Sequence, residues 1–468
     1  MTSQNAISAV LARLDETLDA ARGRLFDLLR IPSISAQPDH AADCRKAAAW
    51  LSGELGALGF TASVRPTEGH PMVVAHHPGP GAGTNGPHVL FYGHYDVQPA
   101  DPLDLWTSAP FDPVLVDGPA GKRIVARGAV DDKGQVMSFL TACRAWHAVT
   151  GGLPVRVSVL IEGEEECGSP SLEAFLAANR DELSADLALI SDTNMWNIDT
   201  PAITTRLRGM VYAQIDLKGP SRDLHSGMFG GAALNPLNLL TRILGDLHDD
   251  AGRIRIPGFY DGVAELPAEL AGQWQGLGFD EAAFLGGVGL SVPAGEHGRT
   301  ALDRLWARPT ADINGIWGGY MGPGSKTVIP AEAHAKVSFR LVPGQDPQAV
   351  AAGLKRFVAD RLPPDATADV QVFSGAPGIE VPTTAPWVKA AQAALTDEFA
   401  RPPVLAGCGG SIPVVEALQR HLGLDSLLMG FGLDDDQIHS PNEKFELRCF
   451  HRAARSHARL LARLAGAA

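Results

Sequence analysis

The chain has 468 residues, 45% of them hydrophobic and 20% charged, which is a globular composition and excludes the disordered and fibrous classes of protein. Its 53 acidic residues outnumber its 39 basic residues, so the formal net charge is −14, and binding to nucleic acid or to an anionic membrane surface is not expected. No run of about 18 uninterrupted apolar residues occurs, so no transmembrane helix is expected either.

The N-terminal stretch and the cysteines indicate the compartment. Charged residues interrupt the N-terminal stretch too often for a secretory signal peptide. The five cysteines lack CxxC spacing, which disfavours both a disulfide framework and a cysteine-ligated zinc site. These features predict a cytoplasmic protein with reduced thiols.

Apolar residues from Ile7 to Leu28 recur at helical spacing and predict one amphipathic helix that ends before Pro32. A second helix is predicted over Ala42–Leu58, and strand-like and helical patterns alternate after it. The predicted strands are Met72–Ala75, Val89–Tyr92, Val155–Ile161, Leu187–Ile190 and Leu427–Met429. The predicted helices are Gly134–Ala148, Leu172–Asn179, Ile412–Arg420 and Lys444–Leu464. This alternation predicts an α/β domain with a mostly parallel sheet.

The middle of the chain has a different pattern, in the order strand, helix, strand, strand, helix, strand. These elements are predicted over Val211–Leu217, Leu234–Leu247, Thr310–Ile316, Ala335–Leu341, Pro347–Leu362 and Asp369–Phe373. The order is typical of a small α+β domain of ferredoxin-like type. We therefore predict that residues 207–376 form a second domain, which interrupts a first domain made of residues 1–206 and 377–468.

Five polar clusters follow predicted strands. They are Gly93–Asp96, Arg127–Gly134, Glu162–Glu166, Ser191–Asp192 and His439–Glu443. Taken singly, each also fits an ordinary structural role, such as a helix cap, a turn or solvated loop charge. Taken together, they occur at one topological end of the sheet, where open α/β sheets bind their ligands.

Carboxylate oxygens and imidazole nitrogens suit Zn²⁺, Mn²⁺ or Co²⁺. Two such ions about 3.5–4 Å apart can share one carboxylate and one water, which then becomes hydroxide near neutral pH. Adjacent glutamates allow one to bind a metal and the other to transfer protons. The residues by themselves thus favour a two-metal α/β hydrolase.

The sequence resembles the M20 metallopeptidases, and within them the carnosinase-like dipeptidase branch. The matching segments are GHYDVQP (93–99), RGAVDDKG (127–134), IEGEEECGS (161–169), Ser191-Asp192, HSG (225–227), KTVIP (326–330), FRLVP (339–343), GGSIP (409–413) and HSPNEK (439–444). They follow the order of the family and span nearly the whole chain. The resemblance implies a catalytic domain in two parts, residues 1–206 and 377–468, and a lid and dimerisation domain over 207–376.

The resemblance also implies a metal-ligand set for two divalent ions, zinc or manganese, with cobalt as a third ion that suits it. His94 and Asp192 would bind one ion, and Glu166 and His439 the other. Asp131 would bridge both ions, next to a cis peptide bond with the residue that follows. A metal-bridging hydroxide would be the nucleophile.

The remaining implied roles concern catalysis and substrate. Asp96 would hold the outer ring nitrogen of His94, and Glu165 would be the general base and acid. His225 would reach from the partner subunit of a homodimer and stabilise the oxyanion. The substrate's terminal carboxylate would be bound by Arg340, Thr327 and Ser411.

One departure from the family concerns the substrate. Gly407 and Cys408 stand where carnosinase-like relatives carry Arg-Glu before GGSIP. Recognition of the amino end of a dipeptide is therefore open, and the substrate is a small peptide or an acyl-amino acid. One alternative is a deacylase or carbamoyl-type amidohydrolase of N-acyl amino acids on the same fold. Another is a catalytically inactive binding or scaffold protein.

Overall fold

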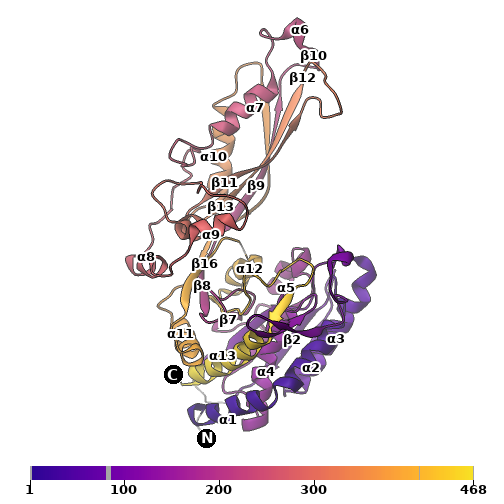
Figure 1. Ribbon diagram of the computed structural model, residues 1–468, viewed down its shortest axis with the longest axis vertical. Coiled ribbons are helices and arrows are strands. Elements are labelled where there is room, and N and C mark those ends of the chain that lie inside the picture. The colour runs from indigo at the N-terminus through magenta and orange to yellow at the C-terminus, as the bar shows by residue number, and fades with distance from the viewer. Residues whose placement is uncertain (1–2, 81–85, 411, 467–468) are drawn as a thin grey trace. The chain divides into compact units, whose positions relative to one another are not determined.

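The computed structural model describes residues 3–80, 86–410 and 412–466 (Figure 1). The chain divides into two compact units. The first comprises Met1–Thr205, Val381–Ala406 and Ala417–Ala468, and the second comprises Arg206–Glu380 and Gly407–Glu416. Residues 407–416 thus belong to the second unit, whereas the sequence pattern predicts them in the first domain. The predicted domain boundaries, at residues 206/207 and 376/377, stay a prediction.

The first unit is built on a mixed sheet with the strand order β1-β2-β6-β3-β7-β17-β8. In that order the strands are Thr61–Arg65, Met72–His77, Val157–Glu162, Val89–His94, Leu187–Ile190, Ser426–Leu428 and Ala202–Leu207. The central strands β6, β3, β7 and β17 run parallel, and the flanking strands pair antiparallel. All residues of β3, β6 and β7 are buried, as expected for parallel strands covered on both faces. The predicted fold class is confirmed.

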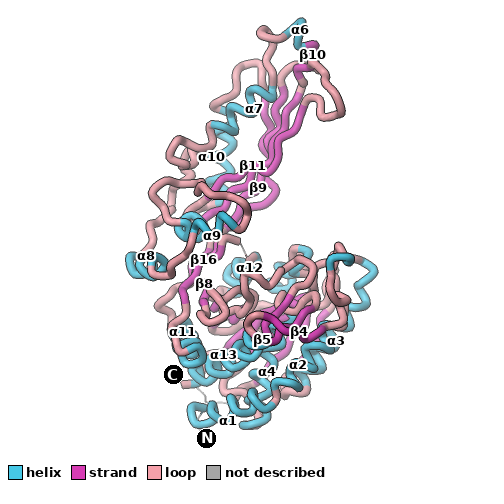
Figure 2. Tube along the Cα trace, in the orientation of Figure 1, coloured by secondary structure: helices cyan, strands magenta, loops and turns pink. Residues whose placement is uncertain are grey.

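Helices surround this sheet (Figure 2). They are α1 (Ser3–Glu16), α2 (Leu18–Leu29), α3 (Ala41–Gly56), α4 (Lys133–Thr150), α5 (Leu172–Ala178), α11 (Pro386–Phe399) and α13 (Leu447–Ala465). Helix α12 (Pro413–Leu422) spans the boundary between the two units in the sequence. Short 3₁₀ turns cover Pro38–His40, Leu103–Leu105 and Glu165–Cys167. Helices α1, α4 and α11 pack against α13, and α4 packs against β3.

A small antiparallel sheet, in the order β18-β5-β4, lies in the same unit. Its strands are Lys444–Glu446, Gly121–Val125 and Val114–Gly118. The prediction that the last helix begins at Lys444 is wrong, because pairing with β5 holds Lys444–Glu446 in an extended strand. The single N-terminal helix was also wrong, since it breaks at Thr17, whose hydroxyl donates to the carbonyl of Arg13 at 2.7 Å.

The second unit contains an antiparallel four-stranded sheet in the order β11-β13-β9-β14. These strands are Thr310–Gly318, Glu332–Leu341, Gly209–Lys218 and Thr367–Ala376. Helices α7 (Pro236–Gly245) and α10 (Pro347–Ala359) pack against this sheet. Along the chain this gives β9-α7-β11-β13-α10-β14, the predicted ferredoxin-like order.

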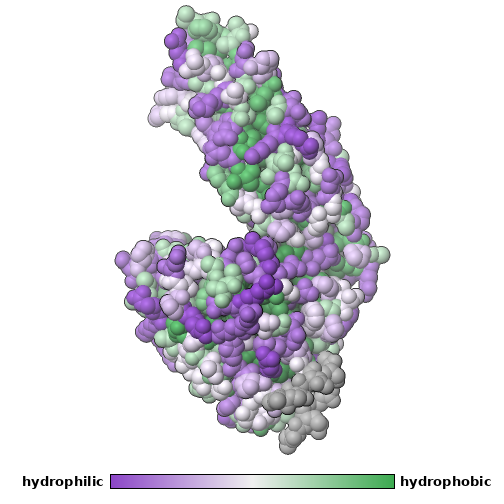
Figure 3. All heavy atoms as spheres, turned by 180° about the vertical axis from the view of Figure 1, so that it is seen from behind, coloured by the Kyte–Doolittle hydropathy of each residue, from purple (hydrophilic) through white to green (hydrophobic). Residues whose placement is uncertain are grey.

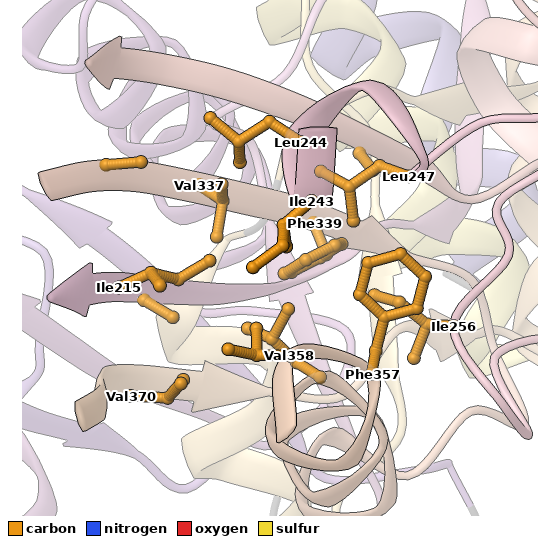
Figure 4. Packing of buried hydrophobic residues seen from close by; sticks show 14 of the residues in the cluster. Ile215, Ile243, Leu244, Leu247, Ile256, Val337, Phe339, Phe357, Val358 and Val370 are labelled. Atoms are coloured by element: carbon orange, nitrogen blue, oxygen red, sulfur yellow. The ribbon is translucent and has the colours of Figure 1, made fainter. Parts of the chain in front are cut away.

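Burial alternates along β9 and β13, so one face of the sheet carries the core (Figure 4). Ile215, Val337 and Phe339 from the strands meet Leu244 from α7 and Phe357 from α10 there. Further elements of this unit are β10 (Leu224–His225), α6 (Ser226–Phe229), α8 (Ala268–Gln275), α9 (Glu281–Gly286), β12 (Val328–Ile329) and a π-helical turn at Asp303–Ala307. The short strands β15 (Ile379–Glu380) and β16 (Val404–Cys408) fall at the unit boundaries in the sequence.

Large apolar side chains are exposed on the edge strands of the second unit. Ile313 and Ile316 on β11 and Phe373 on β14 have exposed fractions of 44%, 47% and 53%. Figure 3 shows apolar surface interspersed with polar surface on the part of the molecule that this unit forms. None of the described helices combines the length and apolarity of a membrane span.

Candidate metal centre and active site

The parallel strands of the first unit place three of the predicted ligands. His94 is the last residue of β3, Glu166 lies in the turn directly after β6, and Asp192 follows β7 by two residues. Because β6, β3 and β7 are neighbours that run the same way, their carboxyl ends lie at one edge of the sheet. Asp131 precedes α4, and His439 lies in the loop before β18.

The side chains form two groups that share Asp131. In the first group, His94 Nε2 lies 3.0 Å from Asp131 Oδ1 and 3.8 Å from Asp192 Oδ2. In the second, His439 Nε2 lies 3.1 Å from Asp131 Oδ2 and 3.2 Å from Glu166 Oε2. Within each group the potential ligand atoms lie within 4.8 Å of one another. The two oxygens of Asp131 therefore face different groups, which is the arrangement of a bridging carboxylate.

The electrostatics of these groups suit cations. Burial raises the pKa of Asp192 to about 8, and the negative charge of Asp131 acts in the same direction. Hydrogen bonds with Asp131 and Glu166 raise the pKa of His439 to about 10. Burial opposes ionisation of Asp131, but His439 and His94 hold its pKa below the usual range. Without a metal, the two imidazoliums compensate part of the carboxylate charge. Divalent ions bound by the same oxygen and nitrogen atoms would compensate it instead.

The backbone around these groups is closely packed. The peptide bond between Asp131 and Asp132 is cis. Asp132 Oδ2 accepts a hydrogen bond from the backbone N–H of His94 at 3.1 Å. A Cβ atom on Gly93 would lie 2.8 Å from that same oxygen and 2.5 Å from Val136 Cγ2. Glycine at position 93 therefore allows β3 to approach the turn that carries Asp131.

Asp96 contacts both ligand groups, through the ring of His94 and through the backbone at Glu166. Its carboxylate is fully buried and accepts the backbone N–H groups of Glu165 at 3.3 Å and Glu166 at 3.0 Å. Asp96 Oδ1 lies 3.4 Å from His94 Nδ1, and that nitrogen is also 3.1 Å from the Asp96 carbonyl oxygen. The half-buried Glu165 is not among the grouped ligands. Burial raises its pKa, which moves this carboxyl group toward the range of a general base at neutral pH.

The remaining predicted site residues belong to the second unit. His225 is exposed, and its Nδ1 accepts the backbone N–H of Gly227 at 2.9 Å. The carbonyl of the exposed Thr327 accepts the N–H of Ser226 at 3.1 Å, so Thr327 and His225 are neighbours. Thr327 precedes β13 in the chain, and His225 pairs with Val328, the residue after Thr327. Arg340 is near the other end of β13, about 26 Å of strand from its first residue, Glu332. Within one subunit, Thr327 is thus not brought to Arg340. Ser411 lies outside the described residues.

Arg340 lines a cleft of about 710 Å³ in the second unit. Register places Arg208 on the same sheet face, because Arg340 pairs with Met210 two residues further along the neighbouring strand. No carboxylate lies within ion-pair distance of Arg208 or Arg340 in the described ranges. Burial and the charge of Arg340 lower the pKa of Arg208 to about 10. Sequence reasoning missed Arg208, because only the pairing of β9 with β13 reveals it.

The departure at Gly407 has a structural counterpart. A Cβ atom at Gly407 would lie 2.4 Å from the Cβ of Trp306 and 2.7 Å from its Cγ. The indole therefore occupies the space that a side chain at position 407 would need. Trp306 comes from the π-helical turn, and nothing in the sequence indicated this packing.

Comparison with known proteins identifies the family. The sequence matches peptidase family M20/M25/M40 over residues 90–463. The chain belongs to this family. It is 34% identical to the human Beta-Ala-His dipeptidase over 76% of this chain and 70% of that protein, and 33% identical to the Schizosaccharomyces pombe Cys-Gly metallodipeptidase dug1 over 93% and 94%. The structure of the M20 metallo-carboxypeptidase Sso-CP2 from Sulfolobus solfataricus aligns with a TM-score of 0.80 at 29% identity, over 95% of this chain and 99% of that one. The predicted enzyme class, a metallopeptidase, is confirmed.

Proposed function

We propose that this peptidase hydrolyses the peptide bond of dipeptides, with two divalent metal ions bound at the centre around Asp131. The observation that carries the proposal is the pair of ligand groups that share this buried carboxylate. Dipeptidase relatives that align over most of the chain support dipeptides as substrates. The donor set suits zinc or manganese, and cobalt as a third ion.

The roles of the residues follow from their positions. His94, Asp131 and Asp192 would hold one ion, and Asp131, Glu166 and His439 the other. When bound, such ions polarise a substrate carbonyl and make a coordinated water more acidic. Glu165 accepts the proton of the attacking water and delivers it to the leaving nitrogen, a role that its raised pKa supports. Asp96 fixes the orientation of the His94 ring.

Arg340 binds the terminal carboxylate of the substrate. Three carboxylates line its cleft, and two of them, Glu281 and Glu296, pair with Arg304 and Arg308. This leaves the guanidinium groups of Arg340 and Arg208 against the one remaining carboxylate, that of Asp312. The surplus of positive charge suits one carboxylate. Apolar neighbours such as Phe284 would contact the side chain next to that carboxylate.

His225 and Thr327 act from the partner subunit of a homodimer. Both residues are exposed, and both lie near the start of β13, far from Arg340 near its end. The exposed apolar side chains on the edge strands of the second unit suit an interface with a partner subunit. A complementation experiment tests this. Mixed dimers of His225→Ala and Glu165→Ala subunits should regain about a quarter of wild-type activity, because half of the dimers are mixed and each has one intact site. Mixed dimers that stay inactive would place His225 outside the partner's site.

A second candidate reaction is the hydrolysis of N-acyl amino acids. Trp306 fills the space beside Gly407, where relatives carry a charged pair, so nothing at this position need bind a free amine. A panel of dipeptides, N-acetylated dipeptides and N-acyl amino acids decides between the two reactions. The protein is stripped with a chelator and assayed after addition of Zn²⁺, Mn²⁺ or Co²⁺. Metal-restored hydrolysis of free dipeptides supports the proposal, and preference for acylated substrates favours the alternative. No metal-restored hydrolysis at all indicates an inactive scaffold.

A cytoplasmic location stays a prediction.

A further inference from the structure

Two buried charged residues of the matching motifs have no role in the chemistry proposed above. Arg127 Nη1 donates to Glu443 Oε2 at 2.8 Å, and each side chain is only 1% exposed. A buried ion pair of this kind contributes little net stability, because desolvation offsets the attraction between the charges. Its other contacts show what the pair holds in place.

The carboxylate of Glu443 organises the loop that presents Asp131. Oε2 also accepts the backbone N–H of Gly128 at 2.8 Å. Oε1 accepts the N–H groups of Val130 at 3.0 Å and of Asp131 at 3.1 Å. Each oxygen therefore has two donors, and the backbone from 128 to 131 curves around this single carboxylate.

Strand pairing brings Glu443 to this loop. In the antiparallel ladder of β18 and β5, Lys444 pairs with Val125. Glu443 and Ala126 continue this ladder by one step, because the N–H of Ala126 donates to the Glu443 carbonyl at 3.1 Å. His439 lies only four residues before Glu443, in a loop where its φ is +61°. For a non-glycine residue this conformation is uncommon and needs support from its surroundings.

Arg127 links the same pair to a third segment. Its Nη2 donates to the Pro99 carbonyl at 3.2 Å, in the loop that follows His94. Thus the segments that carry His94, Asp131 and His439 all meet at one ion pair. His94 is additionally fixed as part of the central sheet, whereas Asp131 and His439 are not strand residues.

We propose that the Arg127–Glu443 pair is a positioning device that sets Asp131 and His439 for the ion they share with Glu166. This inference rests on the metal centre of the proposed function. The ion at His94, Asp131 and Asp192 depends on it less, because β3 and the end of β7 hold two of those three ligands. Glu443 belongs to neither group of potential metal ligands, and it acts through the loop it binds.

The test is a titration of Mn²⁺ into the metal-stripped full chain. Glu443→Gln keeps the shape of the side chain but turns one acceptor oxygen into an NH₂ donor. In either orientation of the amide, this NH₂ faces two donors of the loop or of Arg127. We expect one of the two ions to bind about 10- to 100-fold more weakly, and the other ion, which shares Asp131, to be weakened less. In kinetics, kcat should fall at limiting Mn²⁺ and recover in excess Mn²⁺, with KM for the dipeptide unchanged.

Glu398→Gln is the matched control. Glu398 accepts from Arg455 at 2.8 Å and Arg459 at 2.9 Å in the same unit, with its side chain 6% exposed, and it touches none of the ligand loops. Its titration should match wild type. Wild-type affinities for both ions in Glu443→Gln, or equal weakening of both ions, would overturn the proposal. So would the same loss in Glu398→Gln.

If Glu443→Gln does not fold, Glu443→Asp takes its place and must show the same selective loss. The shorter carboxylate keeps the charge but cannot reach all four donors, and normal binding of both ions in this variant would also overturn the proposal. The titration is independent of turnover. A wild-type chain that binds two ions without cleaving dipeptides would contradict the proposed function. The titrations of the variants would still decide whether the ion pair positions the ligands.

Discussion

Replacing Asp96 by asparagine should weaken metal binding in a protein that still folds. The buried carboxylate accepts two backbone N–H groups, from Glu165 and Glu166, and faces the ring nitrogen of His94 that points away from Asp131. Asparagine keeps one acceptor oxygen, but its NH₂ group opposes one of the two backbone donors. It also removes the negative charge that orients the imidazole.

The contacts give two separate magnitudes. Loss of a group that orients a metal ligand lowers metal affinity by about 10- to 100-fold. At a fixed excess of metal, this reduces the metal-dependent stabilisation by about 1.4–2.7 kcal/mol. One backbone N–H left buried without an acceptor costs about 1–3 kcal/mol, and this cost is present with and without metal.

Thermal unfolding with and without Mn²⁺ separates the two effects. Asp96→Asn should unfold at a lower temperature than wild type in the metal-free state, and Mn²⁺ should raise its unfolding temperature less. Asp181→Asn, the same change at an exposed position, serves as the control and should behave as wild type. If Mn²⁺ stabilises Asp96→Asn as much as wild type, Asp96 does not orient His94 and the reasoning is refuted.

Three more outcomes are expected. Glu165→Gln should lower kcat by about 10²- to 10⁴-fold while both ions still bind, measured by turnover and metal titration, and retained turnover would remove Glu165 from proton transfer. Arg340→Met should raise KM for dipeptides much more than it lowers kcat, and an unchanged KM would place the carboxylate elsewhere. Metal affinity should rise with pH by about tenfold per unit below the pKa of about 10 of His439, because the metal-free imidazole must lose its proton to bind. Proton release on Mn²⁺ addition measures this, and binding without proton release would contradict it.

Much of the fold could be predicted because local patterns and tertiary packing agree. The apolar runs of β3, β6 and β7 are short and uninterrupted, as buried parallel strands require. The alternation in β9 and β13 matches a sheet with one face on the core. The errors lie where a distant contact decides: Lys444 continues a helical pattern locally, yet β5 pairs with it as a strand.

The candidate site divides in the same way. Strand ends were enough to nominate five polar clusters and a two-metal site, and the resemblance to the M20 family then singled out His94, Asp131, Glu166, Asp192 and His439 within them. Arg208, Trp306 and Glu443 were not nominated. Arg208 gains its meaning from the register of β9 on β13, and Glu443 from the register of β18 on β5. Register is a relation between segments far apart in the chain, and no local pattern encodes it.

By itself, the amino-acid sequence determined the class of chemistry, because the side chains that follow the strands set which ligands are available. It also determined the α/β pattern of the first domain and the α+β pattern of the second, because burial imposes the period of a helix or a strand on the apolar residues. Only the tertiary structure decided that the two oxygens of Asp131 face different ligand groups, and that Thr327 lies beside His225 rather than Arg340. Those facts depend on distances between segments that are not adjacent in the sequence, and these distances are set when the whole chain packs.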